Sequence, residues 1–320
     1  MHRLNPTLLT ALGAVWLSSP ALAVEATATR NGSILRLAWD GKTICDYQME
    51  PGATPEGVPA HFQHGAHLHP IFSPTGKIVT GNHQPDHPWQ RGVWIAWTKT
   101  DFAGKQPDFW NMGKGGKIMA EVRFEQLEKT WSGATCGFVS RHLFLDHHRQ
   151  PGEKVLDESW EVRASQLNLE GTLTNVIDLT SLQTCAGPHP LRLPKYHYGG
   201  LGVRGNPAWN APDAVTMLTS EGLDRAKGDA SKARWVYLGG NLEGGTAGLA
   251  VLIHPSNFRF PQPLRLNPSN PQLCIAPSQD GDWSIEPGKP LRSRYRLLVF
   301  DGKPDPGWLQ SQWTTYSKLP

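Results

Sequence analysis

The sequence predicts an all-β protein built as a large sandwich of antiparallel sheets. Short runs of β-branched and aromatic residues recur along the chain, and Gly, Pro, Asn or Asp bounds each run. The 320 residues include 33 Gly and 27 Pro, which interrupt the chain too often for long helices. A chain of about 300 residues can bury a sizeable core between two such sheets.

The expected strands follow one another without an internal repeat, a low-complexity tract or a linker. We therefore expect one domain over residues 24–320. In "SILRLAWDG" apolar and polar residues alternate and a turn closes the run, which is typical of a strand. The same rule predicts strands at residues 33–41, 91–98, 116–128, 136–146, 156–165, 167–176, 244–255 and 291–302. The helix candidates are short, and the clearest lies within residues 304–319.

Residues 1–23 have the features of a secretory signal peptide. Arg3 gives a basic start, an apolar stretch runs from Leu8 to Leu17, and Ala21-Leu22-Ala23 forms a small-x-small cleavage site. The alternative is an N-terminal membrane anchor, but the apolar stretch is shorter than the roughly 20 residues that span a bilayer. We expect a periplasmic or secreted protein with no membrane span after signal removal.

Charge and cysteine content exclude several classes of partner and site. A formal net charge of +3 gives no electrostatic reason to expect a nucleic-acid partner. The four cysteines form no CxxC pair, which argues against a zinc knuckle or a thioredoxin-like site. In an exported protein, disulfides and buried free thiols are both compatible with Cys45, Cys136, Cys185 and Cys274.

Six of the 13 histidines lie between His61 and His87. His67 and His69 are two residues apart in an extended segment, so their side chains share one face. With His87 as a third ligand they would form a divalent-metal site, although Asp86 or His197 could also supply that ligand. The alternative is a polar cleft lined by hydrogen bonds alone, and no cofactor is assigned.

The segment "NHQPDHPWQRGVW", residues 82–94, places titratable groups where a stiff loop meets a strand. Asp86 can orient His87 and raise the basicity of its imidazole. Arg91 can bind a carboxylate or stabilise a developing negative charge. The alternative is a solvated loop that holds an Asp–Arg pair.

Three further patches, around Asp108, His197 and His254, carry candidate residues. Asp108 is either a second carboxylate across a cleft or the cap of a turn. In "YHYGGLGVR", His197 is a candidate acid or base, and Arg204 should face away from Leu201 and Val203. The candidate substrate-binding residues are His69, Gln90, Trp94, Trp110, Tyr198, Arg204, His254 and Asn257.

The motifs HLHPIFSPTG, DHPWQRGVW, DFW…GKI, YHYGGLGVR and HPSNFRFP occur in this order between about Pro59 and Gly302. In this order they resemble the PmoA-like domain family, exported bacterial proteins often labelled "methane oxygenase PmoA". The resemblance implies a soluble β-sandwich like the galactose-mutarotase supersandwich, in proteins often found beside carbohydrate enzymes. Many relatives have DHPHHRG, so Trp89 and Gln90 replace two histidines here. Where relatives often carry Lys-Glu, this chain has His197 and Tyr198.

Together these features predict a periplasmic carbohydrate-active enzyme, either a glycoside hydrolase or a lyase. His87, oriented by Asp86, would act as acid or base, and Asp108 or His197 would act from the opposite wall. Arg91 and Arg204 would hold substrate oxygens or a uronate carboxylate. The alternatives are a non-catalytic saccharide-binding protein and a metal-dependent oxidoreductase, which the family label suggests.

Overall fold

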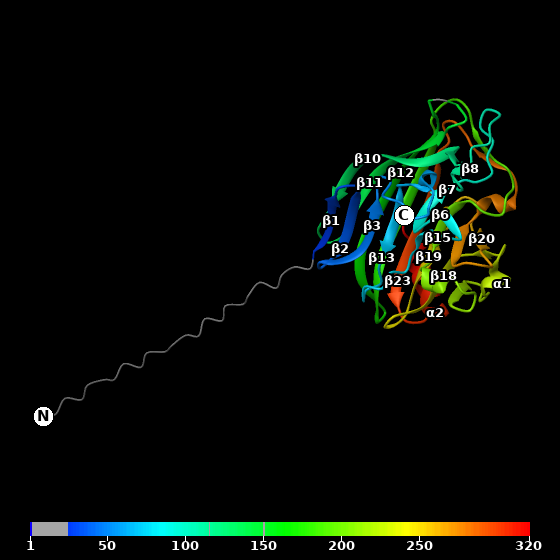
Figure 1. The fold of residues 1–320 in the computed structure, drawn as a ribbon. Helices are drawn as coiled ribbons and strands as arrows, with labels where there is room; N and C mark the ends of the chain where they lie inside the picture. The colour runs from blue at the N-terminus through cyan, green and yellow to red at the C-terminus, as the bar shows by residue number, and fades with distance from the viewer. Residues whose placement is uncertain (2–24, 115, 150) are drawn as a thin grey trace.

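Two large antiparallel sheets stack face to face in the computed structural model of this chain, which describes residue 1 and residues 25–114, 116–149 and 151–320 (Figure 1). The all-β sandwich predicted from the sequence is confirmed. The expected signal peptide, residues 1–23, lies outside the described residues apart from Met1. In the described part of the chain, no helix is long and apolar enough to cross a membrane.

The first sheet has nine strands. In spatial order they are β1 (Ala26–Asn31), β2 (Ile34–Trp39), β3 (Lys42–Gln48), β4 (His67–Ile71), β7 (Val93–Ala96), β15 (Gly200–Arg204), β21 (Gln272–Ile275), β20 (Gln262–Leu266) and β17 (Lys232–Ala233). Strands that are distant in sequence, such as β7, β15 and β21, are therefore neighbours. This order brings three separate segments of the chain to one end of the sandwich.

The second sheet has eight strands, several of them long. They are β10 (Ala120–Trp131), β11 (Cys136–Asp146), β12 (Glu153–Leu169), β13 (Thr172–Cys185), β23 (Leu291–Asp301), β19 (Gly245–Ile253), β18 (Trp235–Leu242) and β16 (Val215–Thr219). One sequence expectation fails here, because residues 167–176 are not one strand. Glu170 and Gly171 both have positive φ, of 51° and 89°, and form the tight turn between β12 and β13.

Three two-stranded ribbons and five short helices complete the described structure. The ribbons pair β14 (Leu191–Leu193) with β22 (Trp283–Ile285), β5 (Asn82–Gln84) with β6 (His87–Arg91), and β8 (Gly113–Lys114) with β9 (Lys117–Ile118). The helices are α1 (Arg225–Gly228), α2 (Pro306–Tyr316) and the 3₁₀ turns η1 (Ala60–Phe62), η2 (Pro207–Trp209) and η3 (Pro277–Asp280). The predicted C-terminal helix is confirmed as α2, which Asp305 caps by accepting hydrogen bonds from the amides of Gly307 and Trp308.

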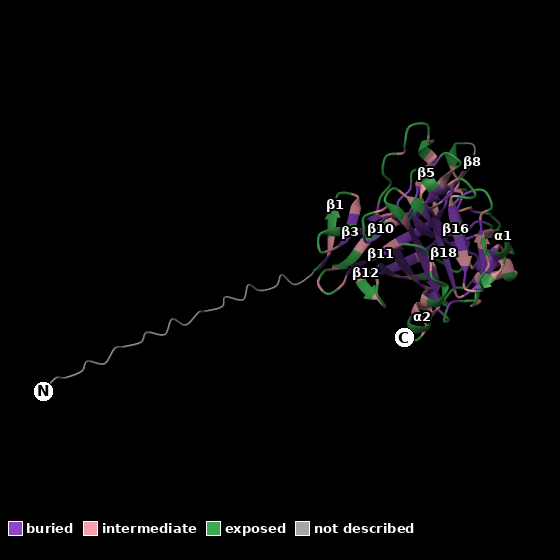
Figure 2. Cartoon of the chain, turned by 90° about the horizontal axis from the view of Figure 1, so that it is seen from below, coloured by how far each residue is buried: buried purple, intermediate pink, exposed green. Residues whose placement is uncertain are grey.

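The core fills the space between the sheets, where Figure 2 shows the buried residues gathered. Strand β19 has a continuous apolar sequence because both of its faces are buried. Leu249 and Val251 pack into the core between the sheets, while Ala250 and Leu252 pack on the outer face beside residues of α2. All four cysteines are unpaired, and three of them are buried.

Strands β7 and β15 position the site, since each has one face in the core and one face turned outward. Val93 and Ile95 lie between the sheets, whereas Trp94 lies on the other face in a second apolar cluster with Trp110. In β15, Leu201 and Val203 point into the core between the sheets. Gly202 is required there, because a Cβ at this position would lie 2.7 Å from the Trp94 and Trp110 rings.

Candidate functional site

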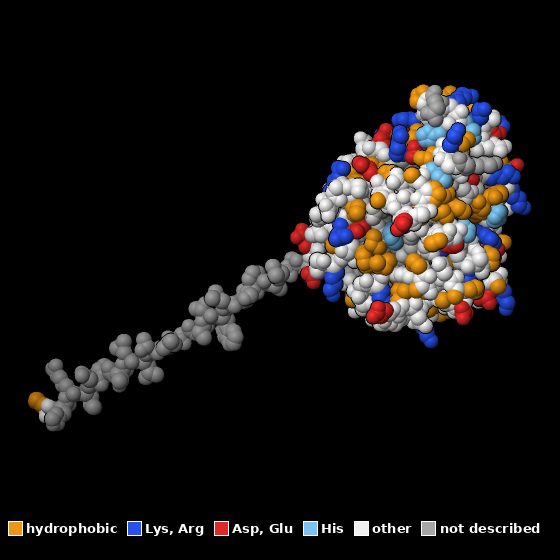
Figure 3. Space-filling model, viewed as in Figure 1, with side chains coloured by type: hydrophobic (Ala, Val, Ile, Leu, Met, Phe, Trp, Pro, Cys, Tyr) orange, Lys and Arg blue, Asp and Glu red, His pale blue; other side chains and the backbone are white. Residues whose placement is uncertain are grey.

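A pocket of about 200 Å³ opens over this second apolar cluster. It brings together β6, the turn before β8, the segment leading into β15, and the hairpin of β20 and β21. Five of the residues predicted for the site line it, namely His87, Gln90, Trp110, His197 and Tyr198. The others are Trp89, Asn111, Arg265, Asn267 and Gln272. Figure 3, drawn in the view of Figure 1, shows histidine side chains reaching the surface among apolar side chains on the right of the molecule.

His87 and Asp86 form a hydrogen-bonded pair at the pocket wall. Nδ1 of His87 lies 3.0 Å from Oδ2 of Asp86, and that oxygen also accepts a hydrogen bond of 2.9 Å from Nδ2 of Asn270. Partial burial opposes ionisation of Asp86, but the hydrogen bond from His87 and the charge of Arg204 outweigh it and lower the carboxyl pKa. A carboxylate at this distance favours a proton on Nδ1 of His87, which leaves Nε2 as the ring nitrogen that faces away from Asp86.

Arg204 is fully buried and supports this pair from behind. Its Nη2 donates to Oδ1 of Asp86 at 2.7 Å and also to Gln84, while its Nη1 donates to Oε1 of Gln90 at 2.7 Å. Burial lowers the pKa of the Arg204 guanidinium, and Asp86 opposes that shift. Arg204 does not line the pocket, so the structure places it as a positioning residue for Asp86 and Gln90 and not as a group that touches substrate.

Asp108 caps a turn and does not line the pocket. Its Oδ1 accepts hydrogen bonds from the amides of Trp110 and Asn111 at 3.0 and 2.9 Å, and its Oδ2 accepts one from Nδ2 of Asn111 at 2.6 Å. Burial raises the pKa of Asp108, and these hydrogen bonds limit the increase. The turn-cap alternative therefore fits the structure, and the position across a cleft does not.

Tyr198 is held at the pocket by the same turn, because Nδ2 of Asn111 also donates to its hydroxyl at 3.1 Å. Burial raises the pKa of Tyr198 above its ordinary value, so the phenol stays protonated at neutral pH. His197 precedes Tyr198 in the chain. Burial lowers the pKa of the His197 imidazole, and the charge of Arg265 lowers it further. The pocket thus combines a protonated phenol with the imidazole of His197, whose pKa is lowered.

Comparison with family models decides the relationship of this chain. Residues 35–314 match the model of a family of unknown function, DUF6807. The chain belongs to that family.

The DUF6807 match corrects the resemblance inferred from the five motifs, because the family shown for this chain is DUF6807 and not a PmoA-like family. The motifs are short and rich in Gly, Pro and aromatic residues. The oxidoreductase activity suggested by the PmoA label loses its basis with that correction. No curated protein matches the chain.

Among solved structures, the DUF6807 chain is similar to the heparan sulfate lyase HepC from Pedobacter heparinus. The TM-score is 0.36 and the sequence identity is 9%, over 88% of this chain and 37% of the lyase. The chain thus spans little more than a third of the length of that protein. A likeness this distant carries no argument about function.

The pocket of this DUF6807 protein contains residues that the sequence did not single out. Arg265 lies in β20, Asn267 follows that strand, and Gln272 begins β21. Both strands reach the site because β21 pairs with β15. Nη1 of Arg265 forms an ion pair of 2.5 Å with Asp229. The segment "NPSNP" between the two apolar strands is the signal that could have marked this hairpin as a polar rim.

The three candidate metal ligands, His67, His69 and His87, do not come together. Nδ1 of His69 lies 3.0 Å from Oγ1 of Thr80, and His67 is buried away from the pocket. Among the described residues, no group of three His, Cys, Asp or Glu side chains has the arrangement of a metal site. His69, which the sequence also suggested for substrate binding, does not line the pocket.

Three more of the predicted residues, His254, Asn257 and Trp94, lie outside the pocket, as does Arg91. His254 bonds to Ser256 at 2.7 Å and to the carbonyl of Leu319 at 3.0 Å, so it holds the C-terminus. Asn257 exchanges hydrogen bonds with the backbone of Arg294. Trp94 is fully buried beneath the pocket, with its ring centroid 4.6 Å from that of Trp110. These three residues shape the fold and do not contact a ligand in the pocket.

Proposed function

We propose that this protein is an exported carbohydrate-active enzyme whose pocket binds one unit of an acidic saccharide and cleaves its glycosidic bond by β-elimination. The observation that carries the proposal is that one pocket is lined by the imidazole of His87, held at Nδ1 by Asp86, and by the phenol of Tyr198, which burial keeps protonated. An imidazole and a protonated phenol are suited to act as base and acid.

The lining of the pocket suits a sugar. Trp89 is partly exposed and offers aromatic surface on which a pyranose ring can stack, while Trp110 is almost fully buried and supports the pocket from the core. The side-chain amides around them can each donate to and accept from hydroxyl groups, and they belong to Gln90, Asn111, Asn267 and Gln272. This combination of apolar surface and a few convergent polar groups is typical of small-ligand sites.

The positions of the carboxyl groups outside the pocket lining favour elimination over hydrolysis. Hydrolysis by the common mechanisms needs two carboxyl groups flanking the scissile bond. Among the residues that the structure describes, no Asp or Glu lines the pocket. Asp86 stands behind His87, and Asp108 is occupied by its turn.

Elimination needs only the groups that are present. His87 Nε2 takes the proton on the carbon next to the uronate carboxylate, and the electron pair forms a C=C bond as the C–O bond to the leaving sugar breaks. The Tyr198 hydroxyl gives its proton to the leaving oxygen, so charge and atoms balance without a redox partner. Arg265 and the amides would stabilise the enolate-like charge that develops on the carboxylate.

A cleavage assay with a matched control tests this proposal. The wild type and the variants His87→Ala and His189→Ala are incubated with uronate-containing and neutral oligosaccharides, and the products are measured by mass spectrometry and by the ultraviolet absorbance of a new double bond. His189 is exposed and lies outside the pocket, so it controls for loss of a histidine. We expect unsaturated products from the wild type and His189→Ala only. Saccharide-dependent thermal stabilisation without any product would instead establish a non-catalytic binding protein.

A further inference from the structure

A second pocket, of about 500 Å³, adjoins the first, and the side chain of His197 lines both. The proposed base and acid, His87 and Tyr198, line the first pocket and not the second. The second pocket is therefore a separate space beside the reacting groups. The residues that complete its lining are Lys195, Tyr196, Ala230, Pro263, Gln279 and Asp280.

Hydrogen bonds between the segments that face each other fix the shape of the second pocket. Nε2 of Gln279, in η3, donates to the carbonyls of His197 and Leu264 at 2.9 and 3.0 Å. The amide of Tyr196 donates to the carbonyl of Ser278 at 3.2 Å. The space is thus formed without a ligand, as is usual for small-molecule sites.

The second pocket lies next to the proposed proton donor. The ring centroids of Tyr196 and His197 lie 5.0 and 4.8 Å from that of Tyr198. Elimination breaks the bond between the uronate in the first pocket and the sugar unit whose oxygen Tyr198 protonates. That leaving unit has to lie beside Tyr198, where the second pocket offers space for it.

Lys195 supplies an unpaired positive charge at the second pocket. Its side chain is exposed, and no described carboxylate lies within ion-pair distance of its Nζ. Asp282 instead accepts a hydrogen bond of 2.7 Å from the backbone amide of Lys195. The carboxylate of the lining, Asp280, is paired with Nζ of Lys232 at 2.8 Å. The charge of Lys195 is therefore left for an anion.

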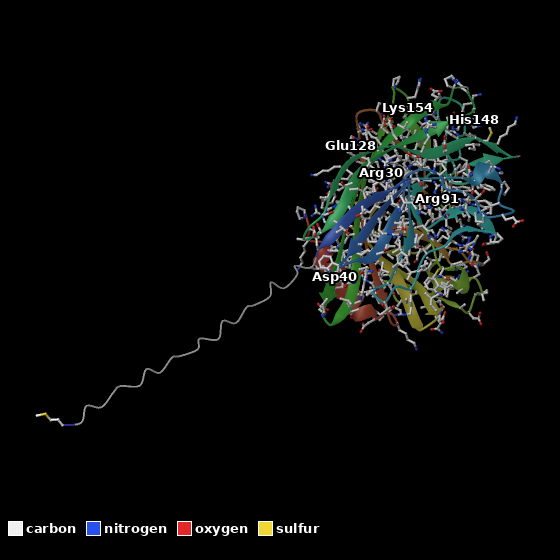
Figure 4. All side chains as sticks on the ribbon, turned by 60° about the vertical axis from the view of Figure 1, so that its left-hand side comes forward. Arg30, Asp40, Arg91, Glu128, His148 and Lys154 are labelled. Atoms are coloured by element: carbon white, nitrogen blue, oxygen red, sulfur yellow. The ribbon has the colours of Figure 1, made fainter. Side chains whose placement is uncertain are left out.

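The arginines near the first pocket do not line the second. Arg204 is fully buried, and Figure 4 shows Arg91 within the body of the molecule. Arg265 lines the first pocket. Recognition of an anion in the second pocket therefore rests on Lys195.

We propose that the second pocket binds the leaving sugar unit and that Lys195 pairs with an anionic substituent on that unit, either a carboxylate or a sulfate ester. This inference rests on the proposed function and narrows the substrate class to saccharides with an acidic group on two neighbouring units. Tyr196, which is half-buried, offers aromatic surface to the ring of the leaving unit. Because Lys195 is exposed, salt should weaken the attraction.

Calorimetric titration of the His87→Ala variant tests the inference under conditions in which we expect no cleavage. The ligands are a free uronic acid and three disaccharides with a uronate at the reducing end. The non-reducing unit of the disaccharides is a second uronate, a sulfated sugar or a neutral sugar. At least one doubly acidic disaccharide should bind about fivefold more tightly than the singly acidic one, the ratio that one exposed charge pair gives. Equal affinities, or no binding of any ligand, would overturn the proposal.

Two lysine variants in the same background provide the matched comparison. Lys195→Met should remove the preference for the doubly acidic ligand and leave the affinity for the free uronic acid unchanged. Lys318→Met removes an exposed lysine outside both pockets and should keep the preference. A preference that survives Lys195→Met would show that Lys195 does not bind the anion.

Mass spectrometry of each titration mixture separates this inference from the proposed function. Unsaturated products formed by His87→Ala would refute the proposed base and leave the second pocket untouched. A wild-type protein that shows the Lys195-dependent preference and forms no product would refute elimination alone. Cleavage by the wild type without that preference would refute the second pocket alone.

Discussion

Oδ2 of Asp86 lies 3.0 Å from Nδ1 of His87, and the same carboxylate receives Nη2 of the buried Arg204 at 2.7 Å. The three residues form a chain from the interior to the pocket, in which each fixes the orientation of the next. Asp86→Asn removes the charge but keeps the shape. We expect it to lower kcat by about 10²-fold or more with little change in KM, because the imidazole loses its fixed tautomer. An unchanged kcat would show that Asp86 does not orient the base.

Tyr198 should act as the acid. Tyr198→Phe removes the hydroxyl that Asn111 holds at 3.1 Å and leaves the ring in place. We expect kcat to fall by about 10²-fold with substrates that have a poor leaving group, and by much less with an activated aryl leaving group. A uniform loss with both substrate types would point to a structural role for the hydroxyl.

Asp108 provides the contrasting case, because its oxygens are occupied by the turn that carries Asn111. Asp108→Asn should lower the free energy of unfolding by about 1 kcal/mol, since charge-assisted hydrogen bonds are weakened. Activity should fall less than about tenfold, well below the effect of losing a general acid or base. Denaturant titration and steady-state kinetics measure the two effects, and a larger kinetic loss would restore Asp108 to the catalytic set.

The core contains a fully buried hydrogen bond between His142 and Glu158, neither of which lines the pocket. Nδ1 of His142 lies 2.9 Å from Glu158, both side chains have no exposed surface, and Ser181 and Gln183 also donate to that carboxylate. Glu158→Ala should cost about 3–5 kcal/mol, because it leaves the buried imidazole without its partner. Glu161→Ala, at an exposed position on the same strand, should cost less than about 0.5 kcal/mol. Urea unfolding compares the two variants.

Stability should decrease in acid through the buried histidines. Burial lowers the pKa of His64, His67 and His83, and lowers that of His69 to about 4. Below pH 6.5 the unfolded chain binds protons that the folded chain does not, so this part of the stability is complete above pH 6.5 and is lost as the pH falls towards 4. His69→Gln should flatten the melting-temperature profile over that range. A variant profile parallel to the wild type would contradict the assignment.

The sequence could predict the strands and the meeting of His87, Trp110 and His197, because alternation, turn residues and short polar motifs are local features. It could not predict Arg265, Asn267 or Gln272, since they reach the pocket through the pairing of β21 with β15. It also placed Arg91 in the cleft with Gln90. Successive residues of a strand point to opposite sides, and only the fold shows which side is buried.

Cleavage in water enriched in oxygen-18 separates elimination from hydrolysis in a single experiment. The wild-type protein would be incubated with a uronate oligosaccharide, and the masses of both products would be measured. If His87 and Tyr198 carry out elimination, products measured before the anomeric oxygen exchanges with water contain no heavy oxygen, and their two masses add up to that of the substrate. Product masses that add up to the substrate plus one molecule of heavy water would show hydrolysis and contradict the proposed chemistry of the pocket.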